Sequence, residues 1–422
     1  MSECVASRQR LLRIFAAALS AVAGHTAVRR ALTRRPINGS VWVCAIGKAA
    51  ESMALGAADV CGDALVGGLL ITKVGHLNPS QLDGLGIASQ VGGHPIPDAG
   101  SLDAGRRLLA ALHTLPHDNT LLFLLSGGAS SLVDVPTRGR TVADLQRMNQ
   151  WLLGSGLPID AMNLVRKAVS QIKAGGLLSI LNATAGQRRV MRQLAISDVP
   201  GDVPSVIGSG LLVPEDDLAQ SVSRLELPAW LLDWVRQGLS ERAGRRCPIR
   251  PDRVPEMELV ATLADARGAA LDTGRQEGLR VWLHETFIAG DAAARGRRLA
   301  RILIDSAPGL HVWGGETTVR LPPSPGRGGR NQHLALAAAI ELAGHEDCLL
   351  LSAGTDGTDG STTDAGALVD GGTLARARAD RIAALEYLDR ADAGSLLEIS
   401  GDLIHTGATG TNVMDLILGL KP

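Results

Sequence analysis

Short apolar runs rich in branched side chains alternate with helical patterns along most of this chain, and this alternation constrains the fold more than any other feature. It is typical of βαβ units arranged around a parallel sheet. Strands are predicted at residues 41–46, 65–72, 121–125, 190–196, 279–284, 311–313 and 348–352, and helices at 49–60, 102–115, 142–153, 162–181, 292–304, 332–342 and 373–391. The predicted fold class is therefore α/β.

The length of the chain and one irregular segment predict how it divides into domains. A domain usually holds roughly 100–200 residues, so 422 residues predict two domains. The best linker candidate is segment 244–255, where three prolines stand among four arginines without any apolar period. The predicted domains are residues 1–245 and 256–422.

Charge and aromatic content argue against two classes of partner. The 42 Lys and Arg side chains balance 43 Asp and Glu, so no global field attracts a phosphate backbone or anionic lipids. Six Trp, three Phe and one Tyr offer few rings on which unpaired bases could stack. No nucleic-acid partner is expected. No apolar run approaches the length of a membrane span, about 18 residues, so no membrane partner is expected either.

Cysteine usage bears on the compartment. The five cysteines are far apart and form no C-x-x-C pair, which indicates a reducing environment and a cytoplasmic protein. The apolar segment 14–24 follows three arginines and resembles a short secretory signal. However, apolar side chains recur there at helical spacing, which favours an amphipathic helix packed on a core; they are Leu11, Phe15, Leu19 and Val22.

The first of four glycine-rich loops follows the strand predicted at 41–46. Gly47 and Lys48 stand where this strand ends and the next helix begins. A lysine at a helix N-terminus is unfavourable by roughly a few tenths of a kcal/mol unless it faces an anion. Lys48 is therefore interpreted as a phosphate or carboxylate contact, with a solvated lysine as the alternative.

The second loop follows the strand predicted at 121–125. Its small residues and free hydroxyls suit a phosphate-binding nest, and they include Ser126, Gly127, Gly128 and Ser130. Tight strand-to-helix packing is the alternative reading. The sequence has no G-x-x-x-x-G-K-[ST], no G-x-G-x-x-G after the first strand and no G-x-S-x-G, so P-loop, dinucleotide and serine-hydrolase readings lose support.

Two further loops lie in the second half. Glu316 lies in a Gly-Gly-Glu-Thr-Thr segment, and Arg330 and Asn331 open a predicted helix, where they can give forked hydrogen bonds to an anion. An exposed polar loop capped by Asn331 is the alternative. Thr355 and Asp356 belong to a Gly-Thr-Asp-Gly-Thr-Asp-Gly segment whose carboxylates suit Mg²⁺, although Asx-turns would explain the Asp-Gly pairs equally well.

Other polar groups are less specific. Asp198 follows the strand predicted at 190–196, and His94 begins a His-Pro-Ile-Pro-Asp segment. Arg166, Lys167 and Lys173 fall in the helix predicted at 162–181, where they form either a basic face for a small acid or a solvated face.

Nine of these segments together resemble a known family, in the order AIGKAAESM, GGHPIPDAGS, SGGASSL, NLVRKAVSQIKAGG, ISDVPGD, GGETTV, GRGGRNQ, GTDGTDG and TGATGTNVMDL. The chain resembles the bacterial and archaeal glycerate 2-kinases whose C-terminal part is called the MOFRL domain. The resemblance runs from about residue 8 to residue 420. It implies an N-terminal α/β/α Rossmann-like sandwich, a second α/β (MOFRL) domain whose last helix is a candidate to pack back on the first, and an active site in the cleft between them.

The resemblance also implies an activity and its site. With Mg²⁺, ATP would phosphorylate the 2-hydroxyl of D-glycerate and give 2-phosphoglycerate. A homodimer is considered as the assembly of the protein. Lys48 and Arg330 match family residues regarded as catalytic or ligand-binding, and Asp356 matches the GTDG aspartate. The hypothesis for the phosphates is that Ser126 to Ser130 cradle them. Asp356 or Asp198 would hold the metal or take the hydroxyl proton, and the choice stays open.

Two alternatives and three departures qualify this prediction. The alternatives are an NAD(P)H-dependent hydroxypyruvate reductase, which the missing dinucleotide fingerprint disfavours, and a non-catalytic protein that binds hydroxy acids. The family's S-G-P is Ser209-Gly210-Leu211 here, its K-G-G is Lys173-Ala174-Gly175-Gly176, and a segment expected to be rich in aromatic residues, 391–397, has no Phe. None of these departures replaces a charged residue, but they leave open which hydroxy acid the protein prefers.

Overall fold

The computed structural model describes residues 3–184, 189–244 and 254–422. The chain divides into two compact units, which are described separately: unit 1 holds residues 1–23 and 261–422, and unit 2 holds residues 24–260. Most of the predicted linker, 244–255, lies outside the described residues.

Unit 2 is a three-layer α/β/α sandwich around a six-stranded sheet of order β3-β2-β1-β4-β5-β6. The β1–β2, β2–β3, β1–β4 and β4–β5 pairs are parallel. This is the Rossmann order, in which successive strands are added on one side of β1 up to β3 and on its other side from β4 onward. The strands are β1 (Val41–Ile46), β2 (Leu65–Thr72), β3 (Ile87–Val91), β4 (Thr120–Leu125), β5 (Met191–Ile196) and β6 (Met257–Ala261).

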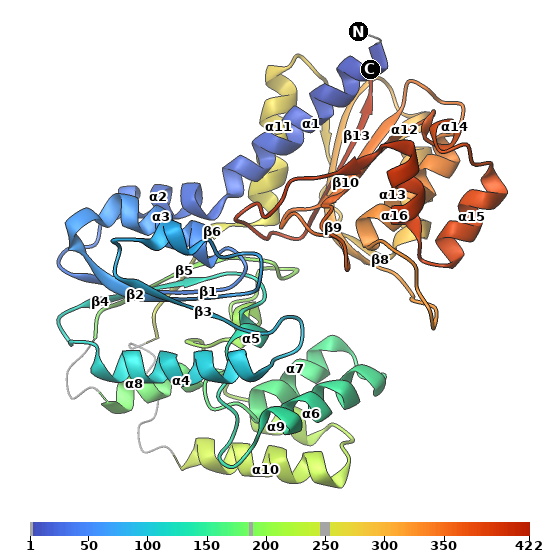
Figure 1. The fold of residues 1–422 in the computed structure, drawn as a ribbon. Helices are drawn as coiled ribbons and strands as arrows, with labels where there is room; N and C mark the ends of the chain where they lie inside the picture. The colour runs from blue at the N-terminus through green and yellow to red at the C-terminus, as the bar shows by residue number, and fades with distance from the viewer. Residues whose placement is uncertain (1–2, 185–188, 245–253) are drawn as a thin grey trace. The chain divides into compact units, whose positions relative to one another are not determined.

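Helices cover both faces of this sheet (Figure 1). α2 (Gly24–Arg34) and α3 (Ala50–Cys61) lie on one face, and α4 (Ala99–Thr114) and α8 (Gly176–Thr184) lie on the other. β4 is buried on both faces, because parallel strands between helical layers meet no solvent. Short 3₁₀ turns occur at Gly62–Ala64, Pro79–Leu82 and Ile207–Ser209.

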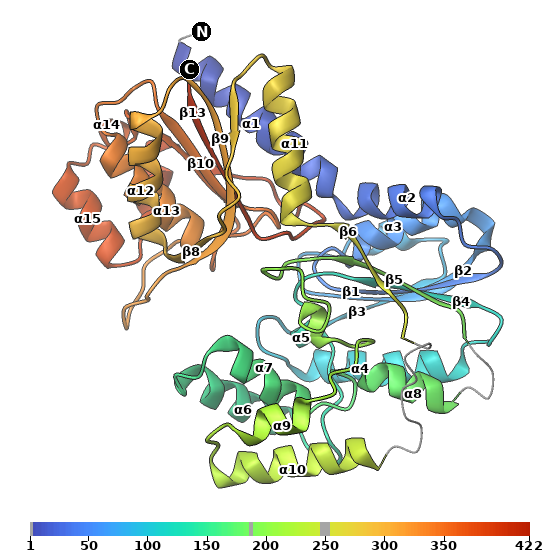
Figure 2. The ribbon, with the colours of Figure 1, turned by 180° about the vertical axis from the view of Figure 1, so that it is seen from behind.

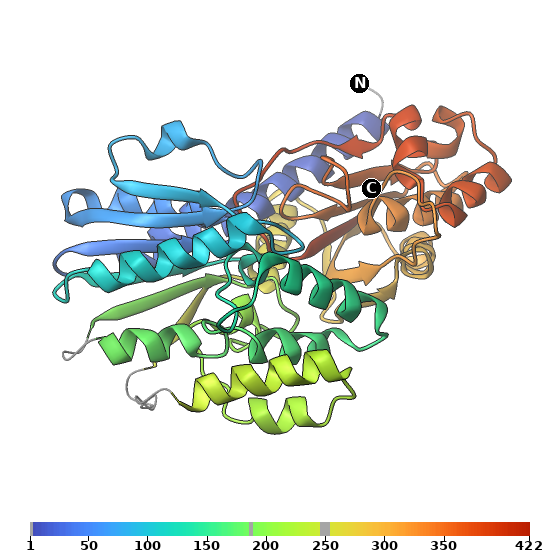
Figure 3. The same ribbon diagram turned by 60° about the horizontal axis from the view of Figure 1, so that its bottom comes forward.

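Most of the remaining helices of unit 2 form a separate cluster, green to yellow-green in Figure 3. Their apolar side chains enclose the buried ring of Trp234. The helices of this cluster are α6 (Val142–Gly154), α7 (Ile159–Ala168), α9 (Leu218–Ser223) and α10 (Ala229–Ala243), whereas the short α5 (Ala129–Leu132) packs in the apolar core of the sheet.

The helix predicted at 162–181 is wrong, since α7 and α8 are separated by a loop. The loop backbone bonds elsewhere: Gln171 N donates to Val135 O at 2.7 Å, and Ala174 N donates to Ser209 O at 2.9 Å. Ala174 also has φ of +48°, a left-handed conformation that interrupts an α-helix. Non-local backbone partners therefore replace the helical bonds that the local sequence favours.

Unit 1 is built on a seven-stranded mixed sheet of order β12-β11-β10-β13-β9-β7, with β8 also pairing with β9. The β13–β9, β10–β13 and β10–β11 pairs are antiparallel, whereas β7 and β8 run parallel to β9. The parallel arrangement predicted for this half is therefore wrong at the centre of the sheet. The strands are β7 (Val281–Leu283), β8 (Ile288–Asp291), β9 (Gly309–Thr318), β10 (Leu349–Gly354), β11 (Gly366–Asp370), β12 (Leu403–Ile404) and β13 (Asp415–Lys421).

Two helical layers enclose the sheet of unit 1 (Figure 2). Along β13, Leu416 and Leu418 join the apolar cluster with α1 and α11, whereas Ile417 joins the cluster with α12 and α13, as the two-residue side-chain period of a strand requires. The helices are α1 (Glu3–Val22), α11 (Leu263–Gln276), α12 (Ala292–Asp305), α13 (Arg330–Leu342), α14 (Thr373–Arg376), α15 (Arg381–Asp389) and α16 (Ala393–Ser400).

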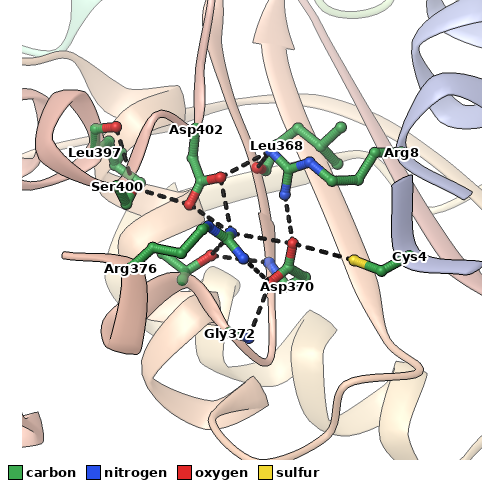
Figure 4. A network of polar contacts seen from close by, with 10 residues as sticks. Cys4, Arg8, Leu368, Asp370, Gly372, Arg376, Leu397, Ser400 and Asp402 are labelled. Carbon is green, nitrogen blue, oxygen red and sulfur yellow. Dashed lines mark hydrogen bonds and ion pairs between the residues drawn. The ribbon is translucent and has the colours of Figure 1, made fainter. Parts of the chain in front are cut away.

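The first 23 residues belong to unit 1, whereas the sequence placed them in the first domain. The predicted amphipathic stripe explains this difference, because Leu11, Ile14 and Phe15 of α1 pack in the cluster formed by β9, β10 and β13. Polar contacts of Arg8 with β11 add to this packing (Figure 4). The unit boundary falls at 260–261, since β6 belongs to the first sheet. The last helix, α16, packs on α13 within unit 1, and the chain ends in β13.

Within the described part of the chain, no single helix is long and apolar enough to cross a membrane, and α1 with α2 meets that criterion only as a bent pair, by length and composition.

Candidate active site

The first two glycine loops meet at the point where the strand order of unit 2 reverses. Gly47 follows β1, and Ser126 follows the adjacent β4. Ser126 Oγ accepts a hydrogen bond from Ala49 N at 3.0 Å, and Lys48 N donates to Gly127 O at 2.9 Å. In open α/β sheets the crevice at such a reversal is the usual ligand site. The structure thus brings together the loops that the sequence identified separately.

Gly47 is required for this junction. Its φ is +131°, and a Cβ atom there would lie 2.2 Å from Ser126 Oγ and 2.5 Å from Ser126 O. Both atoms are too close for any side chain, so only glycine lets the β1 and β4 loops approach. Ser126 is buried and braces the junction with its hydroxyl.

Gly128 forms the wall next to this junction. A Cβ atom there would lie 3.0 Å from the ring of His94 and 3.5 Å from Lys48 Cγ. The imidazole of His94 and the aliphatic stem of Lys48 therefore flank Gly128. His76 Nδ1 also forms a hydrogen bond with Lys48 O, at 2.9 Å, which fixes the backbone of the lysine.

A pocket of about 260 Å³ opens beside these loops within unit 2. Four residues of the sequence prediction bear on it: Gly128, Ser130 and Asp198 line it, and Lys48 lies next to Gly128. Polar residues that the sequence left less specific or did not identify complete its wall; they include His94, Asp134, Asn149, Arg166, Lys173 and Ser209.

Three side-chain contacts shape this wall. Ser130 Oγ and Ser209 Oγ are 2.6 Å apart, and Ser209 has φ of +58°. Lys173 Nζ lies 2.5 Å from Asp134 Oδ2, and Ser170 Oγ donates to Asp134 Oδ1 at 2.7 Å. Because Lys173 and Asp134 are both almost fully buried, each charge is tolerated only through the other.

Unit 1 carries a second group of predicted residues, centred on Arg330 at the start of α13. Arg330 binds Asp415 through two hydrogen bonds, Nε to Oδ2 at 2.7 Å and Nη2 to Oδ1 at 3.0 Å. Its Nη1 lies 2.8 Å from Glu316 Oε1. Burial lowers the pKa of Arg330, but the ion pairs with Asp415 and Glu316 raise this pKa by a larger amount. The guanidinium therefore remains charged.

Asp359 stabilises the backbone that follows Arg330. Its carboxylate accepts hydrogen bonds from Asn331 N at 3.0 Å and Gln332 N at 2.8 Å, which caps the N-terminus of α13. Burial raises the pKa of Asp359 to about 7, although these two N–H groups favour its ionised form. A Cβ atom on Gly329 would lie 2.4 Å from this carboxylate, so glycine is needed immediately before Arg330.

The other predicted residues of unit 1 are engaged within the protein. Asn331 Oδ1 accepts from Ser352 Oγ at 2.7 Å, and Thr355 Oγ1 donates to Met414 O at 2.6 Å. Asp356 Oδ1 accepts from Thr358 N at 3.0 Å, the contact expected of an Asx-turn. Asn331 and Thr355 therefore shape the loops around Arg330.

No group of three or more His, Cys, Asp and Glu side chains among the described residues is arranged to hold a metal ion. Asp198 belongs to unit 2, and Asp356 belongs to unit 1. A metal site built within one unit would therefore contain only one of these two carboxylates.

Sequence reasoning missed Asp415 as the partner of Arg330 and Asp359 as the partner of Asn331. Asp415 and Asp359 lie in the motifs TGATGTNVMDL and GTDGTDG, and membership of these motifs is the only indication of a role that the sequence offers. Their role depends on segments 85 and 28 residues away along the chain. Local spacing cannot supply that information.

Comparisons with known proteins identify the family of this chain. A model described as a domain of unknown function (DUF4147) matches residues 10–229, and one described as the MOFRL family matches residues 309–415. The chain is 34% identical over 417 residues to the D-glycerate 2-kinase of Thermotoga maritima, covering 97% of each chain. The chain belongs to the glycerate 2-kinase family. This confirms the family resemblance based on the nine motifs.

Two further comparisons extend over almost the whole family fold. The crystal structure of glycerate kinase from Thermotoga maritima matches with a TM-score of 0.82 and 33% identity, covering 99% of this chain and 100% of that chain. A relative from Agrobacterium vitis with the name putative hydroxypyruvate reductase is 35% identical over 427 residues, covering 98% of this chain and 94% of its own. Both predicted activities thus occur among the names of relatives.

Proposed function

We propose that this protein is a glycerate 2-kinase, which transfers the γ-phosphoryl group of ATP to the 2-hydroxyl of D-glycerate and gives 2-phosphoglycerate. The observation that carries this proposal is the small polar pocket of unit 2 beyond the ends of β1 and β4. Its volume is below the roughly 300–1,000 Å³ of pockets for larger ligands, which suits a three-carbon acid. The name of the Thermotoga maritima relative, D-glycerate 2-kinase, supports the same substrate.

Phosphoryl transfer depends on positioning and charge neutralisation more than on covalent chemistry. We assign charge neutralisation to Lys48 in unit 2 and Arg330 in unit 1. The rigid frames around them support these roles, because His76 fixes the backbone of Lys48 and Asp415 orients the Arg330 guanidinium. Gly128 and Ser130 offer backbone and hydroxyl groups for phosphate oxygens.

Asp198 is proposed to accept the proton of the acceptor hydroxyl. It lines the pocket, whereas Asp356 is engaged in a turn of unit 1. A carboxylate takes a proton efficiently only when it lies within hydrogen-bond reach of the hydroxyl. The pocket therefore favours Asp198 over Asp356 for this step.

Magnesium is proposed to accompany the nucleotide. Mg²⁺ often takes only one or two protein carboxylates and completes its coordination with water and substrate phosphates. The carboxylates of Asp198 in unit 2 and Asp356 in unit 1 fit that requirement. When bound, the ion would neutralise charge on the phosphate oxygens.

The experiment incubates the protein with D-glycerate, ATP and Mg²⁺ and identifies the product by ³¹P NMR. We expect ADP and 2-phosphoglycerate in equal amounts. A parallel reaction with hydroxypyruvate and NADH tests the reductase reading through loss of absorbance at the NADH band. NADH consumption without phosphorylation would overturn the kinase proposal in favour of a reductase. Glycerate binding without either reaction would favour the non-catalytic protein.

Two substitutions test the residue assignment. Lys48→Ala and Arg330→Ala should each lower kcat/KM by about 100-fold or more, as expected for the loss of one group that stabilises transition-state charge. Arg320→Ala, at an exposed residue in the same loop region as Arg330, is the control and should leave the rate unchanged. Turnover of either variant within about threefold of the parent, under ~1 kcal/mol, would show that the assignment is wrong.

A further inference from the structure

Arg166 is the basic side chain of the unit 2 pocket that lacks a carboxylate partner among the described residues. It lies near the end of α7, and its guanidinium lines the pocket. Its Nε donates to Asn149 Oδ1 at 3.0 Å, and its Nη1 donates to Asn163 Oδ1 at 3.1 Å. Both partners are neutral amides, so neither balances the positive charge.

The neighbouring lysines differ from Arg166 in this respect. Lys173, also on the pocket wall, is paired with Asp134. Lys167, the residue next to Arg166, is buried and paired with Glu215. The basic face considered from the sequence therefore reduces to one uncompensated cation.

Leaving this guanidinium uncompensated is unfavourable in the free protein. Burial lowers the pKa of Arg166, and no carboxylate of the described segments counteracts this shift. A desolvated charge without a counter-ion costs free energy. Sites that keep such groups are commonly functional, because a ligand of opposite charge relieves the cost.

The two amides also fix the direction of the guanidinium. Asn149 is itself buried, and its Nδ2 donates to Leu145 O at 2.9 Å, so its oxygen has one orientation toward Arg166. Arg166 Nη2 makes no hydrogen bond to the described residues, whereas Nε and Nη1 are tethered. A planar fork held in this way can receive a carboxylate with little loss of side-chain freedom.

We propose that Arg166 binds the carboxylate of the phosphoryl acceptor and thereby makes the enzyme select hydroxy acids over neutral polyols. This inference rests on the proposed kinase function and deepens it by assigning acid recognition to unit 2. The hydroxyl groups of Ser130 and Ser209 line the same pocket and can bind the acceptor's hydroxyls. Arg330 is less suited to this task, because its Nε and Nη2 already bind Asp415 and its Nη1 already pairs with Glu316.

The test compares an acid with its neutral isostere. Arg166→Met, which keeps the apolar stem, should raise KM for D-glycerate at least 30-fold, the effect expected when a charged contact that the ligand itself buries is lost. Its kcat/KM for D-glyceramide, in which an amide replaces the carboxylate, should stay within threefold of the parent. Arg166→Lys should fall between the parent and Arg166→Met for D-glycerate, because it keeps the charge and loses the fork.

Arg140→Met is the matched control. The Arg140 guanidinium also donates to a neutral amide, Gln237 Oε1 at 3.2 Å, but it lies over the Trp234 ring and outside the pocket. It should leave both substrates unaffected. A purely structural role of Arg166 would lower turnover of glycerate and glyceramide equally, which would overturn the inference.

Calorimetric binding of D-glycerate without nucleotide separates this inference from the proposed function. Binding that is lost in Arg166→Met, in a protein that phosphorylates no glycerate, would support the acid site and refute the kinase. Phosphorylation that is unchanged in Arg166→Met would refute the acid site and support the kinase. A parent protein that neither binds nor phosphorylates D-glycerate would overturn both.

Discussion

The polar network that fastens α1 to the sheet of unit 1 gives a prediction that can be worked out from the structure (Figure 4). Arg8 Nη1 pairs with Asp370, and its Nη2 lies 2.7 Å from Asp402 Oδ1 and 2.9 Å from Leu368 O. The two carboxylates are only 2% and 1% exposed. Arg8→Met keeps the apolar stem and removes the guanidinium, so it isolates the contribution of the charge.

The size of the effect follows from burial and from the remaining partner. Breaking a fully buried ion pair by removing one partner costs about 3–5 kcal/mol. Arg8 is 21% exposed, and Arg376 still pairs with both Asp370 and Asp402, each at 2.8 Å. These two features reduce the expected loss to about 2 kcal/mol. That loss corresponds to an about 30-fold larger equilibrium constant for the opening of α1, and therefore to about 30-fold faster exchange of its amides.

Hydrogen exchange of the α1 amides, followed by mass spectrometry at pH 7, measures this opening directly. Arg13→Met is the control, because Arg13 lies on the same helix but pairs at the surface with Glu277 and is 59% exposed. It should exchange like the parent. If α1 exchanges in Arg8→Met within threefold of the parent rate, the network does not hold the helix and the reasoning fails.

The acid dependence of the same network has a definite sign. Burial raises the pKa of Asp370, but Arg376 and Arg8 outweigh it and hold the pKa below its usual value. The contribution of Asp370 is therefore complete above its unfolded pKa, about 3.9, and is lost as the pH falls through the lower folded value. The difference between the parent and Arg8→Met should shrink below about pH 4.

Three further predictions concern other parts of the molecule. Gly47→Ala should reduce activity and stability far more than Gly39→Ala, because both glycines have positive φ but only Gly47 has atoms within 4 Å of the added methyl group; thermal unfolding and turnover measure both effects, and equal losses would contradict the steric argument. Lys173→Met should lower the free energy of unfolding of the full chain in urea by about 3–5 kcal/mol, and adding Asp134→Leu should recover most of that loss; a double variant no more stable than the single one would disprove the pairing. Burial among stacked rings lowers the pKa of His311 to about 4, so unit 1 should lose stability as the pH falls from about 6.5 toward 4. Melting temperatures measured over this pH range should therefore change less in His311→Leu than in the parent. Equal changes in the two proteins would show that the pKa of His311 is not lowered.

Much of the fold could be predicted because local patterns determine it. The bounds predicted for β1 and β2 agree with the structure, and the stripe on residues 11–22 predicted α1. The period of apolar side chains reports which face of an element is buried, whatever element covers it. The same local origin explains the error at 162–181, where Gln171 and Ala174 bond to distant backbone.

The sequence by itself determined the α/β class, the family and the loops that carry Lys48, Ser130 and Arg330, since glycine turns and strand ends are encoded by neighbours in the chain. Only the tertiary structure decided which unit α1 joins and which charges are paired. Asp415 reaches Arg330 and Arg8 reaches Asp370 across 85 and 362 residues of chain, and Arg166 has no carboxylate partner among the residues that the structure describes. A charge is satisfied or exposed according to what the fold places beside it, and no local spacing records that.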